Sequence, residues 1–139
     1  MDAERIAAEI YDQTVPGWPG EMDFYREAAR SGSSILEVAC GTGRVALALA
    51  ADGREVIGFD LSPHMIEIAR GKSKGLANIR WAVTDMKSFD LGRTFDLVIS
   101  PGHSFQFMLT IADQLACLRS IHRHLDPRER LCSTLTIRI

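Results

Sequence analysis

Short apolar runs separated by polar and glycine-rich segments dominate the middle of the chain. Runs at residues 35–39, 55–59, 79–83 and 95–100 predict four strands, and each run is followed by polar or small residues. A last segment, 131–139, alternates apolar and polar residues and predicts a further strand. Because the four runs are apolar almost throughout, they are typical of strands that are buried on both faces of a sheet.

Helical periodicity occupies the segments between these runs. Ile6 and Ile10 fall on one face of an expected first helix, which the residues 16–20, Pro-Gly-Trp-Pro-Gly, bring to an end. Asp113 is expected to cap the last helix, which has one apolar stripe. That stripe contains Leu115, Leu118, Ile121 or His122, and Leu125. The remaining helices are expected at 22–30, 44–51 and about 63–73.

The alternation of strands and helices predicts an α/β fold with a doubly wound, mainly parallel sheet and helices on both faces. We expect one domain over residues 1–139, with helices in 1–33 preceding a sheet core in 34–139. In such sheets ligands bind beyond the carboxyl ends of the strands. Four polar residues collect at that edge: Glu37, Asp60, Asp85 and Ser100.

Composition narrows the possible partners. The 139 residues carry a formal net charge of -2, which provides no basic field for nucleic acid or an anionic membrane. The longest apolar run, 45–51, is far too short for a membrane span. Cys40, Cys117 and Cys132 form no CxxC pair, so neither a zinc site nor another metal site is predicted. We therefore expect a cytoplasmic protein with small, soluble partners.

A glycine turn follows the first strand, and two kinds of ligand fit it. Gly41 and Gly43 can turn tightly and let a ligand approach the amides at the start of the next helix. Residues 41–46 match the dinucleotide pattern G-x-G-x-x-G/A, and Asp60 lies 19 residues after Gly41, so an NAD-binding oxidoreductase is one alternative. A carboxylate at Glu37 would repel a pyrophosphate and attract a cation, which favours a positively charged ligand.

Residues 36–44, Leu-Glu-Val-Ala-Cys-Gly-Thr-Gly-Arg, are similar to the glycine loop of class I S-adenosylmethionine-dependent methyltransferases. Residues 59–66, 84–86 and 95–100 resemble the second, third and fourth motifs of that family, in the same order. The resemblance covers about residues 35–125. It implies a Rossmann-like methyltransferase fold, S-adenosylmethionine as cofactor and methyl transfer to a small-molecule acceptor.

The resemblance also implies roles for individual residues. Asp60 would accept hydrogen bonds from the ribose hydroxyls, Asp85 from the adenine amine, and Glu37 would face the methionine portion. The implied cofactor-binding residues are Tyr11, Glu37, Ala39, Gly41, Gly43, Asp60, Leu61, Met65, Asp85, Met86 and Ser100. Independently of the resemblance, His103 follows the fourth predicted strand and is expected to contact the acceptor. No residue is predicted as a catalytic acid or base. Because the sulfonium is already activated, positioning would do most of the catalytic work.

The chain departs from the family pattern at three places. Ala39 stands where glycine is usual, and Arg128-Glu129 stand where the family has two glycines. The sheet of the family also continues for two strands beyond the fifth, and these strands are missing here. An unpaired sheet edge favours a homodimer or an exchanged carboxyl segment. A protein that binds the cofactor without turnover is therefore a second hypothesis. His122 and His124 are expected in a solvated cluster with arginines.

Overall fold

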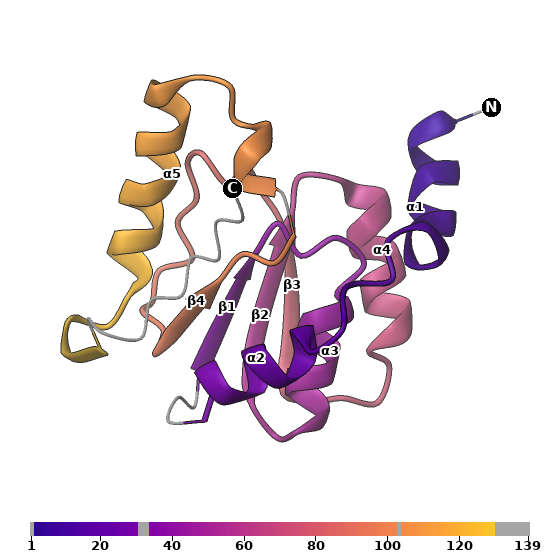
Figure 1. Ribbon diagram of the computed structural model, residues 1–139, viewed down its shortest axis with the longest axis horizontal. Helices are drawn as coiled ribbons and strands as arrows, with labels where there is room; N and C mark the ends of the chain where they lie inside the picture. Colours follow the sequence, from indigo (N-terminus) through magenta and orange to yellow (C-terminus); the bar gives the residue numbers. More distant parts are fainter. Residues whose placement is uncertain (1, 31–33, 103, 130–139) are drawn as a thin grey trace.

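The computed structural model describes residues 2–30, 34–102 and 104–129, and these contain a parallel sheet of four strands. The strand order is β3-β2-β1-β4, so β1 and β2 are central among the described strands (Figure 1). The strands are β1 (Ser34–Val38), β2 (Glu55–Asp60), β3 (Ile79–Val83) and β4 (Leu97–Ile99). The predicted α/β class with a parallel sheet is confirmed.

Helices cover both faces of this sheet, as predicted. α2 and α3 lie over one face and α5 over the other, and α1 packs on α4 beside the sheet (Figure 1). The helices are α1 (Ala3–Thr14), α2 (Glu21–Ala28), α3 (Arg44–Ala51), α4 (Pro63–Lys72) and α5 (Ile111–His124), with short 3-10 turns η1 (Ser104–Phe107) and η2 (Pro127–Glu129).

The apolar runs of the sequence supply two hydrophobic clusters, one on each side of the sheet. In β1, Ile35 joins the cluster beneath α2 and α3, whereas Leu36 and Val38 join the cluster beneath α5. Successive side chains of a strand point to opposite faces, so a strand with helices on both sides needs apolar residues at nearly every position. Every residue of β1 is buried, and this includes Glu37.

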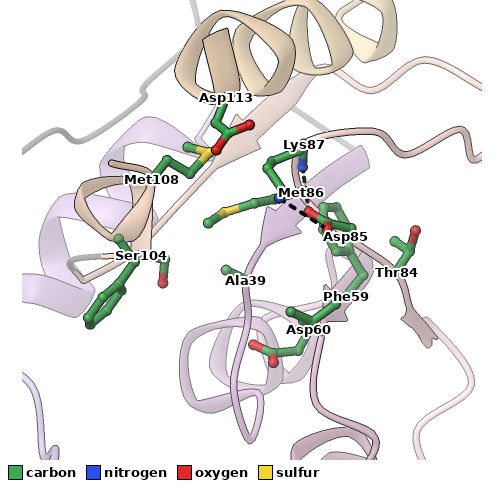
Figure 2. A pocket seen from close by; sticks show the side chains of 12 residues that line it. Ala39, Phe59, Asp60, Thr84, Asp85, Met86, Lys87, Ser104, Met108 and Asp113 are labelled. Atoms are coloured by element: carbon green, nitrogen blue, oxygen red, sulfur yellow. Dashed lines mark hydrogen bonds and ion pairs between the residues drawn. The ribbon is translucent and has the colours of Figure 1, made fainter. Parts of the chain in front are cut away.

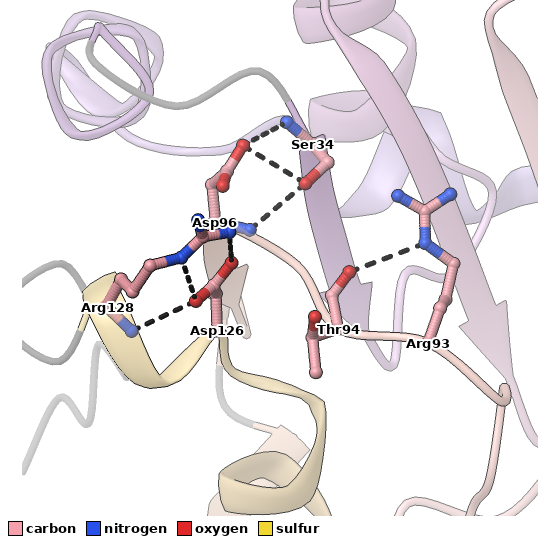
Figure 3. Close-up of polar contacts among 6 residues, drawn as sticks. All are labelled: Ser34, Arg93, Thr94, Asp96, Asp126 and Arg128. Atoms are coloured by element: carbon pink, nitrogen blue, oxygen red, sulfur yellow. Dashed lines mark hydrogen bonds and ion pairs between the residues drawn. The ribbon is translucent and has the colours of Figure 1, made fainter.

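The fourth strand is shorter than predicted. Only Leu97–Ile99 pair with β1, whereas Phe95 forms an isolated bridge with Leu125 and its amide donates to the carbonyl of His124 at 2.7 Å. The carboxylate of Asp96 accepts hydrogen bonds from the amide and the hydroxyl of Ser34, at 2.9 and 3.1 Å (Figure 3). The start of the predicted strand therefore connects β1 to the segment after α5 instead of extending the sheet.

The predicted apolar stripe of the last helix is wrong in part. α5 begins at Ile111, and Thr110 caps it by accepting from the amide of Asp113, the residue that the sequence suggested as the cap. Leu115 and Leu118 are exposed. The buried residues of α5 are Cys117, Ser120, Ile121 and His124.

His124 explains why a polar residue can occupy the inner face of α5. The sequence predicted a solvated side chain here, but the side chain of His124 is buried. Its Nδ1 lies 2.6 Å from the carbonyl oxygen of Ser120. Its Nε2 accepts from the amide of Leu91 at 2.9 Å. These two bonds satisfy a neutral ring that carries its proton on Nδ1. A histidine whose two nitrogens are both bonded is compatible with a buried position.

Two sequence predictions lie outside the described residues: the strand at 131–139 and the position of His103. Among the residues that are described, no helix has the length and apolar character needed to cross a membrane.

Candidate functional site

The turn between β1 and α3 contains three residues with left-handed backbone. Ala39, Gly41 and Gly43 have φ values of 55°, 58° and 83°. The amide of Cys40 donates to the carbonyl of Phe59 at 2.8 Å, which attaches the turn to β2. Alanine is strained in this region by about 1 to 2 kcal/mol. Ala39 stands where glycine is usual in the family, and in the structure it has a positive φ.

Gly43 is the N-cap residue of α3, and its missing side chain makes room for an indole ring. A Cβ at this position would lie 2.2 Å from Cη2 of Trp81, a residue of β3 whose Nε1 donates to the hydroxyl of Ser73 at 2.9 Å. From the sequence, the open space at the glycines was expected to receive a ligand. At Gly43 that space is filled by Trp81.

Gly41 lies beneath the side chain of Tyr11 from α1. A Cβ on Gly41 would lie 3.2 Å from Cε1 of the tyrosine ring. Burial, partly offset by Arg44 and reinforced by nearby carboxylates, raises the pKa of Tyr11 above its usual value. Tyr11 therefore keeps its phenol proton at neutral pH and can act there as a hydrogen-bond donor.

Asp60 connects the glycine turn to the start of α4. Its Oδ2 accepts from the amide of Gly41 at 2.8 Å, and its Oδ1 accepts from the amide of Ser62 at 2.9 Å. These bonds orient the carboxylate at the carboxyl end of β2. Each carboxylate oxygen can accept a second hydrogen bond, so Asp60 retains acceptor capacity for a ligand.

A cavity of about 330 Å³ opens beside Asp60, at the carboxyl ends of β1, β2 and β3 (Figure 2). This volume falls at the lower end of the range for small-molecule sites. The cavity is lined by Ala39, Phe59, Asp60, Leu61, Thr84, Asp85, Met86, Lys87, Ser104, Phe107, Met108 and Asp113. The structure thus brings five of the predicted residues together here: Ala39, Asp60, Leu61, Asp85 and Met86.

Sequence reasoning missed the other lining residues. Thr84 and Lys87 flank the predicted pair Asp85 and Met86. This adjacency in the sequence could have indicated that Thr84 and Lys87 also line the cavity. Asp113 was interpreted only as a helix cap. No pattern indicated the far wall, which comes from η1 and the start of α5 (Figure 2).

The loop after β3 holds Asp85 by a local bond. Its Oδ1 accepts from the amide of Lys87 at 2.9 Å, and its Oδ2 lies 3.9 Å from the Lys87 ammonium. The Asp85 side chain is 40% exposed. A carboxylate with this exposure, at the cavity wall, can still accept from a ligand amine.

Four predicted residues around the turn do not line this cavity, and neither do Met65 and Ser100. Tyr11, Glu37, Gly41 and Gly43 lie in the turn or against it. Met65 is half-buried in the first turn of α4, where its amide donates to the hydroxyl of Ser62 at 3.4 Å. Ser100 is buried immediately after β4.

Glu37 is buried in β1 behind the turn, with an exposed fraction of 2%. The amide of Ala46 donates to its side chain, but Oε2 has no hydrogen-bond partner among the residues that the structure describes. Burial, only partly offset by Ala46 and Arg44, raises the pKa of Glu37 to about 8. From the sequence, Glu37 was expected to be a charged group at the mouth of the turn. In the structure its raised pKa leaves it largely protonated at neutral pH.

Metal-binding residues do not cluster in the described part of the chain. No group of three or more histidine, cysteine, aspartate or glutamate side chains there could hold a metal ion. Cys40 is buried in the turn, and burial together with nearby carboxylates raises the pKa of its thiol far above the usual value. The thiol therefore stays protonated and is a poor nucleophile or metal ligand.

Comparison with known proteins identifies the family. A family model described as "Methyltransferase domain" matches residues 35–128, which contain the glycine turn and every residue that lines the cavity. The chain belongs to the class I S-adenosylmethionine-dependent methyltransferases. This confirms the resemblance seen in the sequence motifs.

Two curated relatives of this methyltransferase chain differ in their named acceptors. It is 31% identical over 128 residues to the dTDP-4-amino-2,3,4,6-tetradeoxy-D-glucose N,N-dimethyltransferase of Saccharopolyspora spinosa, covering 86% of the chain and 50% of the relative. It is also 31% identical over 99 residues to a demethylmenaquinone methyltransferase of Tropheryma whipplei, covering 66% of the chain and 41% of the relative. The chain spans about half the length of the first relative and a smaller share of the second.

A solved methyltransferase structure also resembles this one. The S-adenosylmethionine-bound amino pentose methyltransferase CalS10 of Micromonospora echinaspora aligns with a TM-score of 0.72 at 31% identity. The alignment covers 88% of this chain and 52% of CalS10. The chain therefore aligns with about half of CalS10.

The residues of this methyltransferase fit the family cofactor on two structural grounds. The cavity beside Asp60 has a suitable size and position for a nucleoside at the carboxyl ends of the strands. Glu37, whose Oε2 has no hydrogen-bond partner among the described residues, also provides an acidic group behind the turn that a cation can stabilise.

Proposed function

We propose that this chain binds S-adenosylmethionine at the glycine turn and the adjoining cavity, and that it serves methyl transfer to a small-molecule acceptor. The observation that carries the proposal is Asp60, whose carboxylate is fixed by the amides of Gly41 and Ser62 at the cavity wall. Family membership supports the cofactor. A fixed carboxylate beside a cavity is suited to accept from the two vicinal hydroxyls of a ribose.

The adenosine part is assigned to the cavity. Asp60 would accept from the ribose hydroxyls, and Asp85 would accept from the adenine amine. The Met86 amide would donate to the adenine ring, and Leu61 would cover the ring. The support for this assignment is that all four residues line one cavity of about 330 Å³.

The methionine part is assigned to the turn. The Gly41 and Gly43 region would receive it, with Glu37 behind the turn and Tyr11 in front. Ala39 lies between the two parts, because it belongs to the turn and also lines the cavity. Met65 and the carbonyl of Ser100 complete the proposed cofactor set. The support for Met65 and Ser100 is the family resemblance of their motifs.

Methyl transfer requires an acceptor lone pair in line with the bond between sulfur and methyl. The bound cofactor supplies a methyl group on a sulfonium, which is already activated. The residues of this chain orient the nucleoside and exclude water from the turn. We propose His103 as an acceptor contact because it follows β4, and we assign no residue as general base.

The acceptor is proposed to be a small molecule. Relatives are named for methylating an amino sugar nucleotide and demethylmenaquinone. The formal net charge of -2 also disfavours nucleic acid. Turnover on a panel of amino sugars and quinols separates methyl transfer from cofactor binding alone, because only an enzyme would produce S-adenosylhomocysteine.

We also propose that the protein forms a homodimer or exchanges a carboxyl segment, because β4 is an edge of the described sheet. Light scattering at high protein concentration tests this proposal, and a monodisperse monomer would contradict it.

Replacing Asp60 with alanine tests the proposed cofactor site. We expect the Asp60→Ala variant to bind S-adenosylmethionine at least about tenfold more weakly, because two charge-assisted hydrogen bonds are lost. Isothermal titration calorimetry measures the dissociation constants. Asp90→Ala is the control, since the Asp90 side chain is 87% exposed and does not line the cavity. Equal affinities for the Asp60→Ala variant and the wild type would rule out this role for Asp60.

A further inference from the structure

A polar cluster outside the cavity joins three segments at the glycine turn. Asp12 comes from α1, Thr42 from the turn, and Lys72 is the last residue of α4. The hydroxyl of Thr42 donates to Oδ1 of Asp12 at 2.5 Å, and the Lys72 ammonium donates to Oδ2 of Asp12 at 2.7 Å. The ammonium also lies 3.2 Å from the Thr42 oxygen. Asp12, Thr42 and Lys72 therefore form a closed triangle of hydrogen bonds.

One residue of this triangle, Thr42, is fully buried. Thr42 has an exposed fraction of 0%, whereas the side chains of Asp12 and Lys72 are 41% and 34% exposed. Burial raises the pKa of Asp12, but hydrogen bonds from Lys72 and Thr42 outweigh it and leave this pKa below its usual value. Asp12 is therefore charged at neutral pH, and the ion pair with Lys72 is formed there.

The triangle links α1 to the turn and to the end of α4. α1 packs on α4, and Ala8 is its buried residue. Ile6 and Ile10 are 40% and 45% exposed, so the apolar attachment of this helix is small. Asp12 directly follows Tyr11, whose ring lies over Gly41. A bond that holds Asp12 at Thr42 thus also holds Tyr11 over the turn.

We propose that Lys72 is a positioning residue that fixes α1 over the glycine turn through Asp12 and Thr42, and thereby encloses the methionine portion of the cofactor. This inference rests on the proposed function. It assigns Lys72 no contact with the cofactor. Lys72 acts through Asp12 and Thr42, and its effect is specific to the end of the cofactor that lies at the turn.

Two ligands and three variants test the role of Lys72. S-adenosylmethionine occupies both the turn and the cavity in this proposal, whereas adenosine lacks the methionine portion. The variants are Lys72→Met, Lys72→Arg and the control Arg26→Met. The Arg26 guanidinium pairs with Asp52 at 2.7 Å and has a similarly exposed side chain, but this pair joins α2 to the end of α3.

We expect the Lys72→Met variant to bind S-adenosylmethionine about fivefold to tenfold more weakly, by loss of charge-assisted bonds, and adenosine as the wild type does. Arginine at position 72 can restore the ion pair and should recover most of the affinity. Arg26→Met should change neither constant. Hydrogen exchange should show faster exchange of the α1 amides in Lys72→Met and unchanged exchange in β1 and β2.

Several outcomes would overturn the inference. Unchanged affinity of Lys72→Met for S-adenosylmethionine would do so, and so would an equal loss for both ligands, because a general structural defect predicts the latter. Failure of the wild type to bind S-adenosylmethionine would instead overturn the proposed function. The two failures are thus distinguished by the wild-type titration, which is measured first.

Discussion

Replacing Glu37 with glutamine is expected to remove most of the pH dependence of stability between about pH 5 and pH 8. Burial raises the pKa of Glu37 from 4.5 to about 8 in the folded protein. Between these values the folded state holds a proton that the unfolded state has released. Stability therefore falls as the pH rises through this window, by about 1.4 kcal/mol per pH unit. The loss over the whole window is on the order of 4 to 5 kcal/mol.

The Glu37→Gln variant carries no such proton, so its unfolding free energy should vary far less with pH. Glutamine has two N–H donors where the protonated glutamic acid has one O–H donor. A buried donor that stays unsatisfied costs about 1 to 3 kcal/mol. The variant should thus be less stable than the wild type near pH 5 and more stable near pH 8. Urea unfolding at several pH values measures both curves. Glu27→Gln is the control, because the Glu27 side chain is 68% exposed. Parallel curves for the wild type and Glu37→Gln would contradict the burial of an acid with a raised pKa.

Glu37→Gln also bears on ligand binding. A cation near the turn stabilises the ionised carboxylate, so binding of a sulfonium or ammonium should release a proton from the wild type. The glutamine variant has no proton to release. In calorimetry at pH 7, the binding enthalpy of the wild type should therefore depend on the ionisation enthalpy of the buffer, and that of the variant should not.

Replacing Gly43 with alanine is expected to be the most damaging small substitution in the turn. Two costs combine there. The φ of 83° strains an alanine by about 1 to 2 kcal/mol. Its Cβ would also lie 2.2 Å from Cη2 of Trp81, and relieving such an overlap in a packed region costs about 1 to 3 kcal/mol. We expect a total loss of about 2 to 5 kcal/mol in the free energy of unfolding.

Gly53→Ala is the matched control for Gly43→Ala. Gly53 has a φ of 90°, but a Cβ there meets no atom within 4 Å. Alanine at position 53 is therefore destabilised by backbone strain alone, without a steric overlap. Urea denaturation of both variants separates the two costs. A loss at Gly43 no greater than that at Gly53 would show that Trp81 does not constrain the turn.

The order of strands and helices was predictable from the sequence because local signals agreed with the tertiary structure. The bounds of α3 and β3 match the predicted 44–51 and 79–83. Gly53 follows the C-cap of α3 directly, and strands buried on both faces produce unbroken apolar runs. The parallel sheet then placed Asp60 and Asp85 at one edge, and both line the cavity.

The inner face of α5 was not predictable by the same reasoning. Apolar periodicity favoured Leu115 and Leu118, but Ser120 and His124 are buried in their place. These polar residues are accommodated by backbone groups of Lys87 and Leu91, which lie 33 residues away in sequence. A stripe of apolar residues contains no information about partners at such a distance.

The charge state of Glu37 was also beyond the sequence. Its position in an apolar strand was visible, but its ionisation depends on how completely neighbouring elements exclude water. The far wall of the cavity was missed for a related reason. Residues of η1 and the start of α5 line the cavity because of how the chain runs after β4. No sequence motif indicates that course of the chain.

The central claim is that the glycine turn accepts a cationic nucleoside and not a dinucleotide. Titration of the wild-type protein with S-adenosylmethionine and with NAD, under the same conditions, tests this most directly. We expect saturable binding of S-adenosylmethionine and at least about tenfold weaker binding of NAD, because a sulfonium stabilises the ionised form of the buried Glu37, whereas a pyrophosphate forms no such charge pair there. Tighter binding of NAD than of S-adenosylmethionine would contradict the account.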